Sequence, residues 1–96
     1  MQFFKDEIGR VISQTTGENW TSASTKAVKV VRPSGTSFTK TGTDVVVDDA
    51  ATGQIHILSA TGDLSEVGEY LLQASFTTAS TTLYCPLLTF SVEEIL

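Results

Sequence analysis

The residues whose side chains could carry out a reaction are few, because this 96-residue chain has one histidine, His56, and one cysteine, Cys85. A hydrolytic triad would use His56 as a base beside a nucleophile, yet no Ser lies in a Gly-x-Ser-x-Gly turn. Ile55 and Ile57 flank His56, so if these two face the core of a sheet, the imidazole faces outward. For Cys85 we expect a small, buried or half-buried hydrophobe instead of a reactive thiol. We therefore predict no catalytic residue and no enzymatic activity.

Carboxylates gather in two segments and raise the question of a metal ion. Asp44, Asp48 and Asp49 lie close together in one segment, and Asp63 and Glu66 lie in another. Such oxygens could hold a hard cation, but their spacing matches no calcium loop of alternating ligands, and we favour solvated turns rich in Asp. Zinc would need several Cys and His ligands, which this chain lacks. Glycine-rich phosphate loops are missing as well, so we expect no metal and no cofactor.

Charge and hydropathy narrow the classes of partner. The net charge is −5, and the six Lys and Arg residues are scattered from Lys5 to Lys40, whereas binding to a phosphate backbone needs clustered positive charge. No window approaches the roughly 18 apolar residues of a membrane-spanning helix, and the start of the chain lacks the basic and apolar parts of a signal peptide. We expect neither nucleic-acid nor membrane binding. The single cysteine also excludes an internal disulfide.

The pattern along the chain is typical of an all-β protein. Ser and Thr together make up 25 residues, and Thr suits the pleated, half-exposed surface of a strand. Pro86 cannot donate a ladder hydrogen bond, so it marks an edge or a bulge in the last strand. Short alternating runs between Gly, Pro, Asp and Ser predict strands at 8–13, 25–32, 36–40, 44–48, 54–58, 69–77 and 83–92.

A Gly-containing, acidic turn leads into the strand that starts near Tyr70. Immunoglobulin-like sandwiches begin a central strand with a corner tyrosine, whose hydroxyl folds back onto the preceding loop. Two residues later, where antibody domains have a disulfide cysteine, this chain has Leu72, so packing alone must hold the layers. We predict an immunoglobulin-like antiparallel β-sandwich of about seven strands, a single domain over 1–96 with short arms at 1–5 and 93–96. The predicted core consists of Val28, Val30, Ile55, Ile57, Tyr70, Leu72, Phe76 and Phe90.

Several large apolar residues have no obvious place in that core. Phe3 and Phe4 stand at the start of the chain, and Leu71, Leu83 and Leu87 fall on the strand faces opposite the core set. Either bulges and terminal packing bury some of them, or they form an oligomer interface, because large exposed apolar groups seldom gather without cause. The terminal arms could add docking contacts to such an interface. The candidate interface residues are therefore Phe3, Phe4, Leu71, Leu83, Leu87, Ile95 and Leu96.

The order of the short motifs between Asp6 and Val92 resembles that of small tailed-phage structural proteins with an immunoglobulin-like sandwich. It is similar to the amino-terminal domain of phage baseplate upper proteins, which attach receptor-binding parts to a tail. Those proteins continue into a long helical or fibre-joining region, whereas this chain stops at Leu96, so we expect a stand-alone module. The motifs are Asp6-Glu7-Ile8-Gly9, then Thr25 to Val31 with Arg32-Pro33-Ser34-Gly35-Thr36, then Thr52-Gly53-Gln54-Ile55, then Gly62-Asp63-Leu64 with Gly68-Glu69-Tyr70-Leu71-Leu72-Gln73, and finally Leu88-Thr89-Phe90-Ser91-Val92.

The resemblance implies a non-enzymatic component of the virion, in the baseplate, tail, neck or a fibre adaptor. Its partners would be other phage structural proteins and copies of itself, within a homo-oligomer in the particle. A capsid decoration protein is one alternative. Another is a module that binds a protein or glycan of the host surface, in which Trp20 and Tyr84 would stack on a sugar ring, although Trp20 could equally be part of the core.

Overall fold

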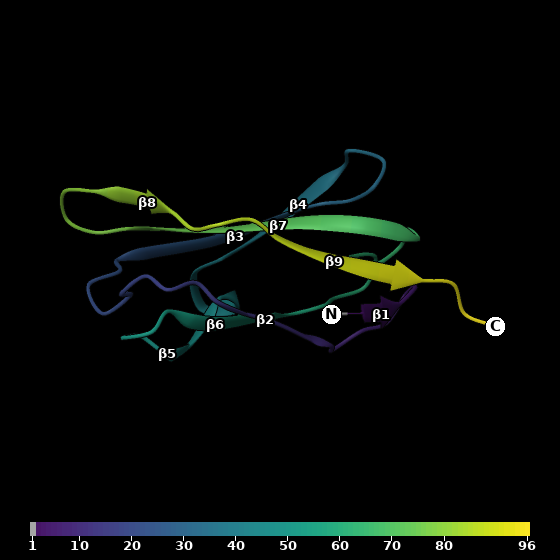
Figure 1. The fold of residues 1–96 in the computed structure, drawn as a ribbon, viewed down its shortest axis with the longest axis horizontal. Coiled ribbons are helices and arrows are strands. Elements are labelled where there is room, and N and C mark those ends of the chain that lie inside the picture. The colour runs from purple at the N-terminus through teal and green to yellow at the C-terminus, as the bar shows by residue number, and fades with distance from the viewer. Residues whose placement is uncertain (1) are drawn as a thin grey trace.

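The computed structural model describes residues 2–96, which form a two-layer sandwich of β-sheets (Figure 1). The predicted all-β sandwich is confirmed. The strands are β1 (Gln2–Phe4), β2 (Val11–Thr15), β3 (Thr25–Val31), β4 (Ser37–Thr41), β5 (Val46–Asp49), β6 (Gln54–Leu58), β7 (Gly68–Thr77), β8 (Thr82–Tyr84) and β9 (Leu88–Glu93), with a short 3-10 helix, η1 (Gly42–Asp44), before β5.

The two sheets differ in size. The larger has the order β1-β9-β7-β3-β4, with β8 pairing to β7, and the smaller has the order β2-β6-β5. In the described range β1 runs parallel to β9, and all the other paired strands are antiparallel. Figure 1 shows the two sheets as layers, with the ends of β1 and β9 at the same end of the molecule.

The structure has nine strands in the described range, not about seven. The predicted last strand is divided into β8 and β9 around Pro86, because its ring nitrogen cannot donate to a ladder. The strand predicted at 8–13 begins only at Val11, since Gly9 has a φ of +77°, which an extended strand does not allow. The additional strand, β1, comes from the segment predicted as an N-terminal arm.

The core lies between the sheets, and all the residues predicted for it are almost fully buried. Successive side chains of a strand point to opposite faces, so alternate residues of β7 from Tyr70 onward enter the core. The ring of Phe90 stacks on Tyr70 with the ring centroids 5.1 Å apart. Phe3 meets Phe90 edge-on at 5.5 Å. Packing joins the two sheets without a disulfide, because Cys85 is a free thiol.

The corner tyrosine has the predicted geometry. The Tyr70 hydroxyl donates to the backbone carbonyl of Glu66 at 2.8 Å and accepts from the backbone N–H of the same residue at 3.0 Å. The turn before β7 is thereby closed onto the first residues of the strand, which sets the direction in which β7 enters the larger sheet.

Candidate interaction surface

Phe3, a predicted interface residue, is in the core instead, and only 2% of it is exposed. Phe3 pairs with Val92 in the parallel ladder between β1 and β9, and both side chains face the smaller sheet. The prediction of a surface position for Phe3 is wrong, because β1 adds a strand to the sheet. The segment 1–5 is likewise not a free arm where it is described: Gln2–Phe4 is β1, and the backbone N–H of Lys5 donates to Glu93. Met1 lies outside the described residues.

Three other predicted interface residues lie at the end of the molecule where the chain begins and ends. Phe4 is 47% exposed and pairs with Glu93 at the edge of the larger sheet. Ile95 and Leu96 follow β9 and are exposed. These side chains are separate from the leucines in the middle of the sheet, so the predicted set does not form one continuous surface.

Leu83 is not on the face that its sequence position suggested. It pairs with Phe76 between β8 and β7, and directly paired residues lie on the same face of a sheet. Leu83 is therefore on the core side of the larger sheet, and it stays partly exposed because β8 is a three-residue strand at the edge. Tyr84, paired with Ser75, points to the opposite face and is 69% exposed.

Leu71 and Leu87 do come together on the outer face of the larger sheet, the side that faces away from the smaller sheet. Together with Val31 they form what we call the apolar patch. Leu71 is 40% exposed and Leu87 is 62% exposed. These residues, with Lys29 and Gln73, line a shallow cavity of about 190 Å³. Val31 was not among the predicted interface residues, although its pairing with Leu71 explains its place in the patch.

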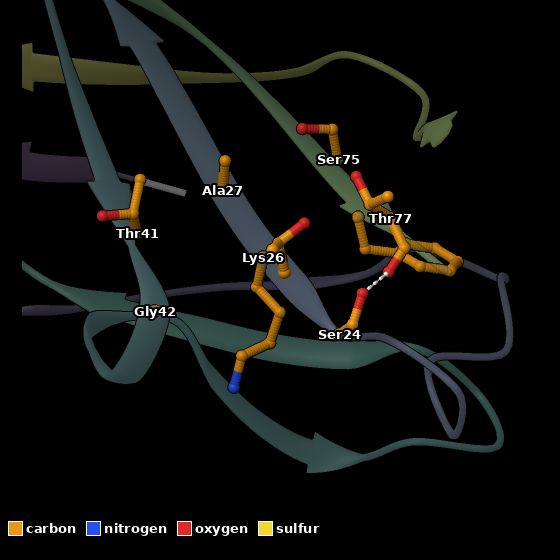
Figure 2. A pocket seen from close by; sticks show the side chains of 9 residues that line it. Ser24, Lys26, Ala27, Thr41, Gly42, Ser75 and Thr77 are labelled. Atoms are coloured by element: carbon orange, nitrogen blue, oxygen red, sulfur yellow. Dashed lines mark hydrogen bonds between the residues drawn. The ribbon is translucent and has the colours of Figure 1, made fainter. Parts of the chain in front are cut away.

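A second hollow lies on the same sheet, toward the ends of β3 and β7 (Figure 2). It has a volume of about 390 Å³ and is lined mainly by small and hydroxyl-bearing side chains of β3, the start of η1 and β7. The Ser24 hydroxyl at its rim donates to the backbone carbonyl of Thr77 at 2.9 Å. Ala27 and Ser75 pair across the two strands on the outer face. This part of the face has more hydroxyl groups than the apolar patch beside it.

Two charged side chains flank the apolar patch. Lys29 lies on β3 opposite Gln73, and Glu69 lies two residues before Leu71 on β7. Both are exposed. Within residues 2–96 neither takes part in an ion pair. Neither residue was among the predicted site residues, because their positions relative to the patch depend on the pairing of β3 with β7.

The smaller sheet also has exposed apolar residues on its outer face. Val11 pairs with Leu58 between β2 and β6, and Leu58 is 49% exposed. Val46 of β5 lies nearby beside a hollow of about 370 Å³ that Leu58 also lines. His56 faces outward on this sheet as predicted, and its Nδ1 lies 2.7 Å from Asp48 Oδ2. Asp48 and His56 on this face therefore already contact each other.

The thiol of Cys85 and the carboxyl group of Glu66 both make contacts within the fold. Cys85 is buried, and burial raises the pKa of its thiol, which makes it less nucleophilic at neutral pH. Glu66 accepts hydrogen bonds from the hydroxyl and backbone N–H of Ser34, and these lower the pKa of its carboxyl group. Within residues 2–96 no three His, Cys, Asp or Glu side chains are grouped so that they could hold a metal ion.

Trp20, one of the two aromatics considered for sugar binding, is buried. Its ring packs on Phe76 with the ring centroids 4.5 Å apart, and its indole N–H donates to the Thr16 hydroxyl at 3.0 Å. The same hydroxyl donates to the carbonyl of Gly53 at 3.0 Å. Gly53 has a φ of +74°, and a Cβ there would lie 2.1 Å from the Thr16 hydroxyl oxygen, so no other residue fits. Trp20 thus fixes the loop before β3 and is not available to stack on a sugar.

Comparison with known proteins identifies no relative of this chain: no protein-family model and no curated protein sequence matches it. None of the helices in the range 2–96 is both long and apolar enough to cross a membrane. Function must therefore be argued from the geometry of the surface together with the resemblance in the sequence motifs.

Proposed function

We propose that this protein is a non-enzymatic structural component of a phage particle, which binds neighbouring particle proteins through the outer face of its larger sheet. The observation that supports this most is the apolar patch on the outer face of the larger sheet, in which exposed Leu71 and Leu87 lie beside half-buried Val31. Exposed apolar residues grouped in this way are typical of protein–protein contact sites.

The topology supports the immunoglobulin-like part of the proposal. In variable-type immunoglobulin domains, the strands called G, F, C and C′ form one sheet and pack on a second sheet that includes B, E and D. Here β9, β7, β3 and β4 are neighbours in that order, and they face β2, β6 and β5. The Tyr70 corner precedes the same central strand as in those domains. These likenesses favour the family suggested by the sequence motifs.

In this proposal the protein binds its neighbours in the particle and catalyses no reaction. The larger sheet is held by ladders on both sides of β7 and by the core beneath it, so its outer face is rigid before it meets a partner. Rigid, preformed surfaces lose less conformational entropy on binding than mobile ones. The apolar patch would supply the buried centre of the contact, and the hydroxyl-lined hollow of Figure 2 would lie toward its polar rim.

Binding to a glycan of the host surface is the weaker alternative. Tyr84 is exposed and lies beside Ser75 and Thr77 on the outer face, so one ring and several hydroxyl groups could meet a sugar. Trp20 cannot stack on a sugar, since it is buried in the core. Capsid decoration uses the same docking chemistry as the leading proposal, and the place of the chain in the particle distinguishes the two.

The proposal is tested by substituting the patch in particles of the phage that encodes the chain. Leu71→Asp places a charge in the centre of the patch, and we expect at least tenfold less of the chain in purified particles by quantitative mass spectrometry. Leu58→Asp is the matched control, because it makes the same change at an exposed strand position of the smaller sheet, and we expect normal incorporation.

Absence of the wild-type chain from purified particles would refute the proposal. Equal incorporation of the two variants would refute the role of the patch. Binding of the purified protein to a glycan array, lost in Tyr84→Ala and kept in Leu71→Asp, would favour the host-surface alternative. Imaging of wild-type particles then shows whether the chain lies in the tail, the neck or the capsid.

A further inference from the structure

The charged residues beside the apolar patch are arranged so that the face is complementary to itself. Val31 pairs with Leu71, and Lys29 pairs with Gln73. Glu69 lies on the other side of Leu71 along β7. Lys29 and Glu69 are thus each displaced by about 7 Å along the strands from the Val31–Leu71 pair, in opposite directions. One positive and one negative side chain stand at equal distances from the midpoint of the Val31–Leu71 pair.

A two-fold axis relates such a face to a second copy of itself. When the axis lies in the plane of the face, passes between Val31 and Leu71 and is perpendicular to the line from Lys29 to Glu69, it exchanges the positions of these two charged residues. Two copies related in this way place each Lys29 opposite Glu69 of the other copy, because a residue in a two-fold interface meets the same partner twice. The apolar residues of the two copies meet at the axis.

The same axis determines the angle between the two copies. With strands about 4.8 Å apart and a rise of about 3.4 Å per residue, it makes the strands of the two facing sheets cross at about 40°. Sheets that pack face to face commonly cross at about 30° because each is twisted. The charge pairing therefore requires a packing angle that sheets readily adopt.

The area of the face fits a weak dimer that dissociates on dilution. The strands β9, β7, β3 and β4 have six, ten, seven and five residues, which at about 16 Å² per residue gives a flat footprint of about 450 Å². A standard stable interface buries about 800 Å² per partner. On the smaller sheet, by contrast, Asp48 and His56 already contact each other within one copy.

We propose that the outer face of the larger sheet binds a second copy of this chain, as a two-fold dimer with Val31, Leu71 and Leu87 at its centre and two Lys29–Glu69 ion pairs at its sides. This inference rests on the proposed function, in which the same face is the docking surface, and it specifies the partner. The dimer is the unit that would be built into the particle.

Charge exchange tests the arrangement, with the association state measured by sedimentation over a range of concentrations. We expect the wild-type chain to dimerise reversibly. Lys29→Glu and Glu69→Lys should each raise the dimer dissociation constant by about tenfold or more, because like charges then face each other. An equimolar mixture of the two variants should dimerise again, since each supplies the charge that the other lost.

Glu18→Lys is the control for Glu69→Lys, because it changes the net charge equally on an exposed loop residue away from the sheet, and it should dimerise like the wild type. Circular dichroism of each variant confirms that it is folded. A wild-type chain that stays monomeric at the highest concentration would overturn the inference. Single variants that dimerise as tightly as the wild type, or a mixture that dimerises no more tightly than either variant alone, would overturn it as well. If the wild-type chain is monomeric in solution but Leu71→Asp is lost from particles, the dimer is refuted and the proposed function stands. If the wild-type chain dimerises in solution but is absent from particles, the proposed function is refuted and the dimer stands.

Discussion

At the scale of single residues, Tyr70 connects the turn before β7 to the hairpin between β3 and β4. Its hydroxyl satisfies both backbone groups of Glu66. The Glu66 carboxylate in turn accepts hydrogen bonds from Ser34 and Thr36 in that hairpin. Because donors surround the charged form, the pKa of Glu66 lies below its ordinary value. The corner tyrosine thus orders a polar network as well as filling the core.

Replacing Tyr70 with Phe tests this network. The ring would keep its core contacts, but the partly buried N–H and carbonyl of Glu66 would lose their partner, so we expect the free energy of unfolding to fall by about 1–3 kcal/mol. Urea denaturation measures the change. Tyr84→Phe removes the same hydroxyl from an exposed ring and should cost about 0.5 kcal/mol or less. Equal effects of the two substitutions would show that the corner hydrogen bonds contribute nothing.

At the scale of elements, β1 changes the interpretation of the start of the chain. A three-residue strand has few ladder bonds of its own, so its stability depends on the burial of Phe3 against Phe90 and Val92. The neighbouring Phe4 points to the other side of the sheet, as the alternation of a strand requires. Two adjacent phenylalanines, similar in the sequence, therefore have opposite roles.

Alanine substitutions separate these roles. Phe3→Ala leaves a cavity in the core, and we expect it to lower the free energy of unfolding by about 3–5 kcal/mol. Phe4→Ala removes a half-exposed ring and should cost about 0.5 kcal/mol or less. Thermal or urea denaturation compares the two. If Phe4→Ala lowered the free energy of unfolding more than Phe3→Ala, β1 would have to pair with β9 in a different register.

At the scale of the whole molecule, one core joins the two sheets and the long loops. Trp20, from the loop between β2 and β3, packs on Phe76 of the larger sheet, while its hydrogen-bond partner Thr16 also bonds Gly53 next to β6. The radius of gyration of 13.4 Å is close to the value of about 13 Å expected for a single domain of 100 residues. The two layers should therefore unfold together.

Trp20 is the only tryptophan of the chain, so its fluorescence reports on this shared core. We expect the urea transition followed by Trp20 fluorescence to coincide with that followed by far-ultraviolet circular dichroism, as for a two-state domain. The measurement belongs at low protein concentration, where association does not add to stability. A fluorescence change at clearly lower urea than the loss of strand signal would show that the loop and one sheet separate first.

Much of the fold could be predicted from local patterns. The alternation from Tyr70 to Phe76 and the paired valines of β3 identified buried faces correctly, because the two-residue period of a strand is a property of neighbouring residues. The residues Arg32-Pro33-Ser34-Gly35, which separate two of the predicted strands, form the turn of the β3–β4 hairpin, closed by a 2.9 Å hydrogen bond from the Gly35 N–H to the Arg32 carbonyl. Leu71 and Leu87 were likewise expected on the face away from the core.

The sequence by itself determined which strands exist and which of their faces are apolar, since both depend on short-range alternation and on the backbone preferences of Gly and Pro. Only the tertiary structure decided where Phe3, Leu83 and Val31 lie and that Lys29 and Glu69 flank one patch. These positions depend on which distant strands pair and in which register, and register is set by the combined packing of many side chains in three dimensions. A shift of one residue between β3 and β7 would turn Lys29 and Val31 toward the core. Local patterns therefore placed Leu71 and Leu87 on the outer face but could not show that Val31, Lys29 and Glu69 lie beside them.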